Sequence, residues 1–130
     1  MKNLNRVVIL VLTISSLLIS CKSKAPKNWI VNKWKLTDLQ GRSVSEMGDS
    51  LKNIYLKSFV IEFNKEGKFT SNDHFAGTVT GKYSLSDDGK SLMTTNEGSE
   101  QTDTVKIESL TDKELVISKD AVKMICQPFK

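Results

Sequence analysis

The sequence has few of the side chains that most catalytic and metal sites require. Its 130 residues include one histidine, His74, and two cysteines, Cys21 and Cys126. A zinc site takes three or four protein ligands, chiefly histidine and cysteine, and this set is too small to supply them. The sequence also contains no glycine-rich phosphate loop and no nucleophile elbow. We therefore expect a protein that is not an enzyme and that holds no metal and no cofactor.

The histidine and the second cysteine are also poorly placed for chemistry. His74 follows Asp73 directly, and adjacent residues on an extended chain point to opposite sides, so the two side chains do not form a dyad. We expect His74 to be solvated in a loop. Cys126 alternates with Val122 and Met124, a pattern that predicts a core-facing thiol acting as a small hydrophobe.

A large excess of charge is also absent. The formal net charge is +4, from 19 Lys and Arg against 15 Asp and Glu. Without Lys2 and Arg6, which precede an apolar run, 17 cations remain against 15 anions, a net charge of +2. No basic stripe runs along the chain, so we expect no nucleic-acid partner. The local excess of lysine between Lys22 and Lys35 is better suited to a solvated segment near an anionic membrane surface.

The apolar run from Val7 to Ile19 is shorter than the roughly 20 residues that a transmembrane helix needs. It follows Lys2 and Arg6, and this order is typical of a secretory signal peptide. The run ends in Leu18-Ile19-Ser20-Cys21, which resembles the bacterial lipobox. The resemblance implies cleavage before Cys21 and lipidation of that cysteine. We predict a signal-peptide helix within residues 1–20, a lipidated cysteine and polar tether over residues 21–28, and one domain over residues 29–130.

Such an anchor would hold the domain at a membrane, because two or three acyl chains bind a bilayer essentially permanently. Residue 22 is Lys rather than Asp, and by analogy with lipoproteins this favours the outer membrane, facing the periplasm, in a host with two membranes. We therefore expect a bacterial cell-envelope location. An ordinary signal peptide with Cys21 as an unmodified thiol, or an uncleaved anchor, remains the alternative.

Short β patterns dominate the chain from Trp29 onward. Phe59, Ile61 and Phe63 alternate with polar residues, as do Val105 and Ile107, which is the period of a sheet with one buried face. About eight strands at this spacing predict a mostly β, up-and-down antiparallel barrel. The predicted strands cover residues 31–39, 58–64, 68–72, 77–85, 90–96, 102–110, 114–119 and 121–127.

One turn and one helix are predicted in more detail. The segment Phe63–Phe69 has Asn first and Gly67 fourth after Phe63, typical of a three-residue hairpin loop with a left-handed glycine, so Phe63 should lie opposite Phe69. Residues 45–57 place Met47, Leu51, Ile54 and Tyr55 at helical spacing. We expect one short helix between the first and second strands, with Ser45 or Asp49 as its N-cap.

Three segments resemble the lipocalin-like domains of Bacteroidetes-type lipoproteins: Asn32–Asp38, Phe59–Phe69 and Gly81–Leu85. The resemblance implies an eight-stranded barrel whose Trp34 plugs the closed end and whose interior encloses a small cavity. Lipocalins proper carry Gly-x-Trp at this point, whereas this chain has Asn32 two residues before the tryptophan.

Two functions follow, and the sequence leaves both open. The first is a membrane-anchored module whose barrel binds a small apolar or amphipathic ligand. The second is a non-enzymatic interaction protein of the envelope, an inhibitor, immunity factor or assembly accessory, with a filled barrel and a protein partner. The side chains predicted to line the cavity or the underside of its lid are Trp34, Leu51, Ile54, Tyr55, Phe59, Ile61, Phe63 and Phe69, with Tyr83, Val105, Ile107, Leu115 and Ile117 as weaker candidates.

Overall fold

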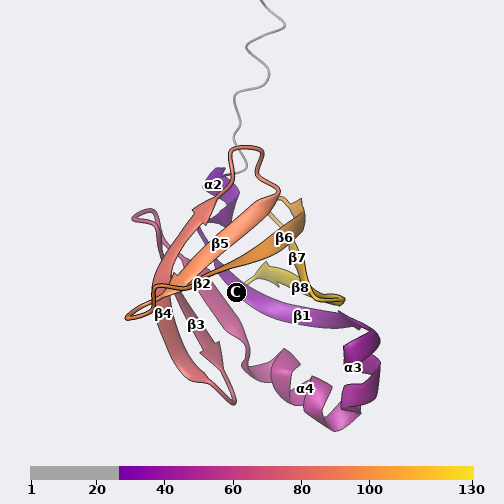
Figure 1. Cartoon of the computed structure of the whole chain (residues 1–130). Coiled ribbons are helices and arrows are strands. Elements are labelled where there is room, and N and C mark those ends of the chain that lie inside the picture. The colour runs from indigo at the N-terminus through magenta and orange to yellow at the C-terminus, as the bar shows by residue number, and fades with distance from the viewer. Residues whose placement is uncertain (1–26) are drawn as a thin grey trace, which may run out of the picture.

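A computed structural model describes residues 27–130 as a closed antiparallel barrel of eight strands in sequence order (Figure 1). The predicted signal peptide, Cys21 and all of the predicted tether except its last two residues lie outside the described residues. The barrel closes because β1 pairs with both β2 and β8. The strands are β1 (Lys33–Gly41), β2 (Val60–Phe63), β3 (Lys68–Asp73), β4 (Gly77–Leu85), β5 (Ser91–Asn96), β6 (Thr102–Leu110), β7 (Leu115–Lys119) and β8 (Val122–Pro128). The predicted fold class is confirmed.

Alternation along the strands decides which side chains face inward. In β1, the buried Trp34 and Leu36 alternate with the exposed Lys33, Lys35 and Thr37. A bulge between Leu36 and Asp38 adds one residue to β1 relative to β8. The added residue shifts the alternation, so that Leu39 rather than Asp38 is buried.

The hairpin between β2 and β3 has the predicted geometry. Phe63 pairs with Phe69, and their ring centroids are 6.5 Å apart. Gly67 has φ of +78°, the left-handed conformation that glycine adopts without a Cβ clash. The Asn64 side-chain oxygen accepts hydrogen bonds from the backbone N–H groups of Glu66 (3.0 Å) and Lys68 (2.9 Å), which fixes the loop.

The predicted single helix between β1 and β2 is wrong in detail, because the chain forms two helices there. These are α3 (Arg42–Met47) and α4 (Asp49–Ser58). Gly48 separates them with φ of +83°, a conformation that no α-helix contains. The predicted N-caps are also wrong: Gly48 holds the N-cap position of α4, and no side chain caps it.

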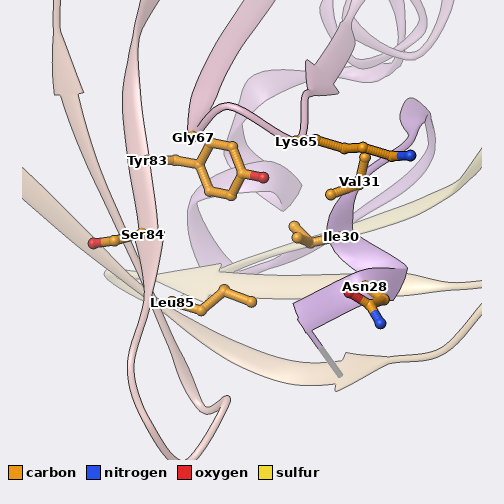
Figure 2. A pocket seen from close by; sticks show the side chains of 8 residues that line it. All are labelled: Asn28, Ile30, Val31, Lys65, Gly67, Tyr83, Ser84 and Leu85. Carbon is orange, nitrogen blue, oxygen red and sulfur yellow. The ribbon is translucent and has the colours of Figure 1, made fainter. Parts of the chain in front are cut away.

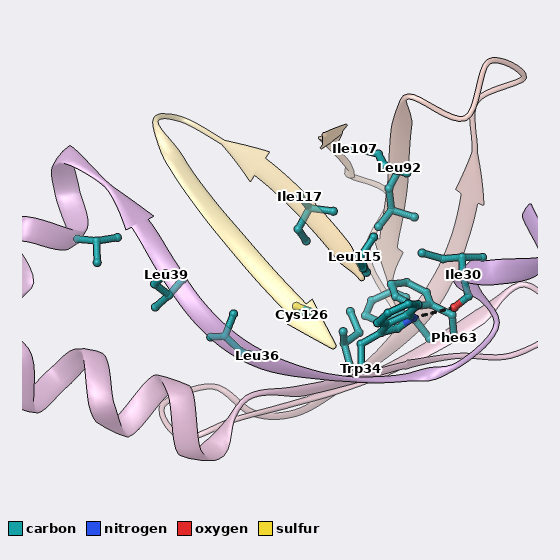
Figure 3. Packing of buried hydrophobic residues seen from close by; sticks show 13 residues of the cluster. Ile30, Trp34, Leu36, Leu39, Phe63, Leu92, Ile107, Leu115, Ile117 and Cys126 are labelled. Atoms are coloured by element: carbon teal, nitrogen blue, oxygen red, sulfur yellow. Dashed lines mark hydrogen bonds between the residues drawn. The ribbon is translucent and has the colours of Figure 1, made fainter. Parts of the chain in front are cut away.

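Buried apolar side chains from all around the barrel form one core cluster (Figure 3). Its fully buried members include Trp34, Phe63, Leu92 and Leu115. A further helical turn, α2 (Lys27–Ile30), covers one end of the barrel and overlaps the last two residues of the predicted tether. The Trp34 Nε1–H donates a hydrogen bond of 3.0 Å to the Ile30 carbonyl oxygen, so Trp34 closes this end as expected.

The two ends of the barrel therefore differ. We call the end at α2 the closed end, and the end at α3 and α4 the mouth. Figure 1 shows α2 and these two lid helices on opposite sides of the molecule. Helix α3 packs on β1 and β8, and α4 packs on β1 and β3.

Within residues 27–130, the eight strands close into a barrel and the buried apolar side chains form one core cluster. The described segment therefore has a hydrophobic core of its own. Within it, no helix is both long enough and apolar enough to cross a bilayer.

Candidate functional site

A small pocket lies at the mouth, between the lid helices and the inner face of the barrel. Its volume is about 280 Å³. We call it the lid pocket. It is lined by Leu36, Leu39, Ser43, Val44, Met47, Tyr55, Phe59, Asp73, Val122 and Met124.

The walls of the lid pocket are continuous with the core. Leu36 and Leu39 from β1 and Val44 from α3 are buried members of the core cluster. Val122 and Met124 from β8 are half-buried and pack against it. The pocket is therefore an unfilled part of the barrel interior at the mouth. An apolar group that bound there would move from water to an apolar surface.

Two contacts hold α4 over the pocket. The Lys52 ammonium lies 3.2 Å from a carboxylate oxygen of Asp38 on β1. The rings of Tyr55 and Phe75 lie 5.2 Å apart, which joins α4 to the hairpin between β3 and β4. Hydrogen bonds from the side chains of Gln40 and Lys52 hold the pKa of Asp38 below its ordinary value.

Asp73 is the charged residue in the lining. It stands two and four positions after Ser71 and Phe69 on β3, so all three face the interior. One of its carboxylate oxygens, Oδ1, accepts hydrogen bonds from the backbone N–H groups of Phe75 (2.8 Å) and Ala76 (3.5 Å). These bonds fix the side chain at the start of the turn.

Most of the predicted cavity residues fill the barrel instead of lining open space. These residues are buried members of the core cluster: Trp34, Ile61, Phe63, Phe69, Ile107, Leu115 and Ile117. Val105 is half-buried and packs against the cluster. The alternation correctly identified the inward face of each strand, but the half of the barrel near the closed end is packed with the barrel's own side chains.

The lid residues divide into three groups. Tyr55 and Phe59 line the lid pocket as predicted. Leu51 is half-buried and is not part of the lining. Ile54 was expected under the lid, but its side chain is 37 % exposed, so that assignment is wrong. Leu51 and Tyr55 of the same helix are half-buried, so Ile54 lies at the solvent-facing edge of α4.

Sequence reasoning missed several residues of the pocket wall. Val122 and Met124 share the alternation that placed Cys126 in the core, and extending that argument would have found them. Leu39 depends on the bulge in β1, which the pattern of the chain does not reveal. Val44 lies in a helix that begins before the predicted one.

A second hollow lies at the closed end, between α2, the β2–β3 turn and β4 (Figure 2). Its volume is about 860 Å³, and it is lined by Asn28, Ile30, Val31, Lys65, Gly67, Tyr83, Ser84 and Leu85. Tyr83, predicted to line the cavity, lies here instead. Its hydroxyl donates a 2.6 Å hydrogen bond to the Asn64 carbonyl, and burial raises its pKa.

The wall of this closed-end groove includes the buried Ile30, whose carbonyl oxygen accepts the hydrogen bond from Trp34. It is a surface groove between turns, with lysine, asparagine and serine among its walls. The lid pocket is smaller, but its walls are largely apolar and belong to the core. We therefore take the lid pocket as the candidate functional site.

The residues considered for chemistry lie apart from one another. His74 is exposed in the β3–β4 turn, where its ring meets the Phe75 ring edge-on at 5.0 Å. Cys126 is fully buried, as predicted, and burial raises the pKa of its thiol to about 12. A thiol in this state is not a nucleophile at neutral pH.

No known protein family matches the sequence, and no curated protein matches it. Solved structures do resemble the fold. A lipocalin-like protein from Bacteroides uniformis superposes with a TM-score of 0.59 at 20 % identity, covering 78 % of this chain and 99 % of that one. An uncharacterized protein from Bacteroides eggerthii gives 0.58 at 20 % identity, covering 76 % and 98 %.

A DUF4847 family protein from Bacteroides vulgatus gives a TM-score of 0.53 at 11 % identity, covering 76 % of this chain and 93 % of that one. At these identities the similarity concerns the fold alone. Together with the closed eight-stranded barrel, it shows that the chain has a lipocalin-like fold.

Proposed function

We propose that this protein is a lipid-anchored module of the bacterial cell envelope that binds a small apolar or amphipathic ligand in the lid pocket. The anchor would be Cys21, in the outer membrane facing the periplasm. The observation that carries the binding proposal is the lid pocket itself, about 280 Å³ of largely apolar space within a barrel that is otherwise filled. This volume is near the lower end of the range of small-molecule sites, so the ligand is small.

The lid helices support the same proposal. An apolar pocket open to water is unfavourable unless something covers or fills it. Here α3 and α4 contribute Val44, Met47 and Tyr55 to the lining. A ligand that filled the space would contact both the barrel and the lid.

The test uses residues 22–130, which contain the complete barrel, and the fluorescent apolar probe N-phenyl-1-naphthylamine. Binding should raise the probe's emission with a saturable curve. Met47→Trp places a large side chain at the half-buried rim of the pocket and should weaken binding at least about tenfold. Ile54→Trp is the matched control, because it makes a similar change on the exposed side of α4 and should leave binding unchanged.

Equal binding by both variants would contradict the assignment to the lid pocket. Native mass spectrometry of the domain purified from its own host would then identify a natural ligand, as a mass above that of the chain. A host-purified domain without bound mass that also fails to bind the probe would favour the second candidate, a protein partner.

One observation favours that second candidate. Phe75, at the tip of the β3–β4 hairpin, is 57 % exposed, and Ile54 on α4 is exposed as well. Phe75 contacts Tyr55 of α4, so the two exposed side chains lie on neighbouring elements, and exposed large apolar side chains that gather on one surface are typical of protein contacts. An inhibitor, immunity or assembly role would use this surface.

A further inference from the structure

We infer that the lid pocket selects a cationic amphiphile, a short apolar body that carries a protonated amine. This inference rests on the proposed function, because it names the chemical class of ligand for the same pocket. Asp73 supplies the selection: it is the charged side chain in a lining that is otherwise mostly apolar.

The carboxylate of Asp73 is held in place through one of its two oxygen atoms, and the other oxygen is left for a ligand. Its Oδ1 atom accepts both turn hydrogen bonds, from Phe75 and Ala76. Among residues 27–130, no lysine or arginine forms an ion pair with Asp73. The Oδ2 atom accepts no hydrogen bond from another side chain or backbone group of the described chain. An ammonium group of a ligand would complete it, and hydrogen bonds between charged groups are the strong ones.

Aromatic walls add to this preference. Tyr55 and Phe59 line the same pocket as Asp73. The faces of their rings carry a negative quadrupole, which attracts cations and repels anions. A carboxylate ligand would meet neither a cation nor a donor of comparable strength in the lining.

The hairpins around the mouth add negative charge near the pocket. The mouth-end segments 73–77, 96–103 and 119–122 contain the acids Asp73, Glu97, Glu100, Asp103 and Asp120, and Lys119 is their only lysine or arginine. Lys119 is already paired with Asp103 at 3.2 Å. On the lid, Lys52 is paired with Asp38, and Arg42 and Lys57 are exposed outside the lining. An approaching cation is therefore attracted to the mouth, and an approaching anion is repelled.

The size of the pocket sets the length of the ligand. At about 30 Å³ for each water-sized group, 280 Å³ holds about nine such groups. Octylamine has that number of non-hydrogen atoms. Octanol and octanoate match it in length and differ in charge, which makes the three a controlled series.

The test measures displacement of N-phenyl-1-naphthylamine from residues 22–130 by octylamine, octanol and octanoate at pH 7. We expect octylamine to bind about tenfold more tightly than octanol, and octanoate to bind more weakly than both. Raising the salt from 20 mM to 500 mM should reduce the advantage of octylamine, because screening weakens the attraction between the amine and the acidic mouth.

Asp73→Asn is the decisive variant. An asparagine oxygen can still accept the two turn hydrogen bonds, so the hairpin should be retained and only the charge is lost. In this variant, octylamine and octanol should bind within about twofold of each other. Asp112→Asn, in the turn at the closed end, removes the same charge far from the mouth and should keep the tenfold preference.

The failures of the two proposals are distinguishable. Equal binding of all three compounds, tighter binding of octanoate, or a preference for octylamine that survives in Asp73→Asn would overturn the charge selection while leaving the pocket as a ligand site. Failure of the probe and of all three compounds to bind would overturn the proposed function, and the inference with it. Unchanged near-ultraviolet circular dichroism shows that each variant has kept its packing.

Discussion

Trp34 combines two roles at the closed end, filling volume and satisfying a carbonyl group. Its side chain is completely buried, and its Nε1–H bonds to the Ile30 carbonyl oxygen. Trp34→Phe would leave that oxygen without its partner and a gap beside it. We expect a loss of about 2–4 kcal/mol in the free energy of unfolding, measured by urea denaturation.

The neighbouring tryptophan provides the control for this measurement. Trp29 is 37 % exposed, so Trp29→Phe should change the free energy of unfolding by less than about 0.5 kcal/mol. Similar losses in both variants would show that Trp34 does not seal the barrel.

Gly67 is required by its backbone conformation and not by lack of space. A Cβ atom there would meet only the Tyr83 carbonyl oxygen, at an ordinary 3.7 Å. The φ of +78° is nevertheless strained for any residue with a side chain. Gly67→Val should therefore lower the free energy of unfolding by about 1–2 kcal/mol. Glu66→Val, in the same turn without a positive φ, is the comparison, and a melting temperature unchanged by Gly67→Val would refute this role.

Among the elements, the lid helix α4 is joined to β1 by the ion pair between Lys52 and Asp38, and this pair is lost when Asp38 is protonated. Hydrogen bonds from the side chains of Gln40 and Lys52 lower the pKa of Asp38 in the folded protein below its ordinary value. A lowered pKa stabilises the folded state above the unfolded-state value, and this contribution is lost as the pH falls through the folded-state value. We thus expect amide protons of α4 to exchange faster, relative to those of β5, as the pH falls below about 4.

The effect should be small, because the Asp38 and Lys52 side chains are 39 % and 32 % exposed. Exposed pairs of this kind contribute less than about 1 kcal/mol. In Asp38→Asn, the exchange of α4 relative to that of β5 should be as fast at every pH as it is in the wild type at low pH. A wild-type exchange ratio that stays constant from pH 6 to pH 3 would exclude this role for the pair.

The elements also show what the sequence can and cannot predict. Strand positions were predictable to within a residue or two, because alternation and turn glycines are local signals. The lid was harder: Gly48 was visible, yet whether it bends one helix or separates two depends on packing against β1 and β8.

The site was the least predictable part. Alternation shows that Ile61 and Phe63 face inward, but not whether other side chains fill the space before them. That depends on volumes contributed by strands far apart in sequence, and on the bulge that turns Leu39 inward. Asp73 shows the same limit, because in the sequence it only adjoins the predicted loop residue His74, and the closed barrel is what places it at the pocket.

For the whole molecule, the first question is the proposed anchor. Cys21→Ser should leave an unprocessed precursor that takes up no labelled palmitate, because the thiol that receives the lipid is gone. The measurement compares the masses and palmitate labelling of the two proteins expressed in a bacterial host with lipoprotein processing. Wild-type protein that carries no lipid, or a labelled Cys21→Ser variant, would rule out the anchor.

The position of α2 determines how a barrel anchored in this way would be oriented. The described chain starts at Lys27, on the end that Trp34 closes, and the lid helices lie on the opposite side (Figure 1). The proposed anchor on Cys21 would attach the barrel to the membrane at this closed end. In the proposed arrangement the mouth would face away from the bilayer, and a ligand would exchange with the aqueous compartment and not with the lipid.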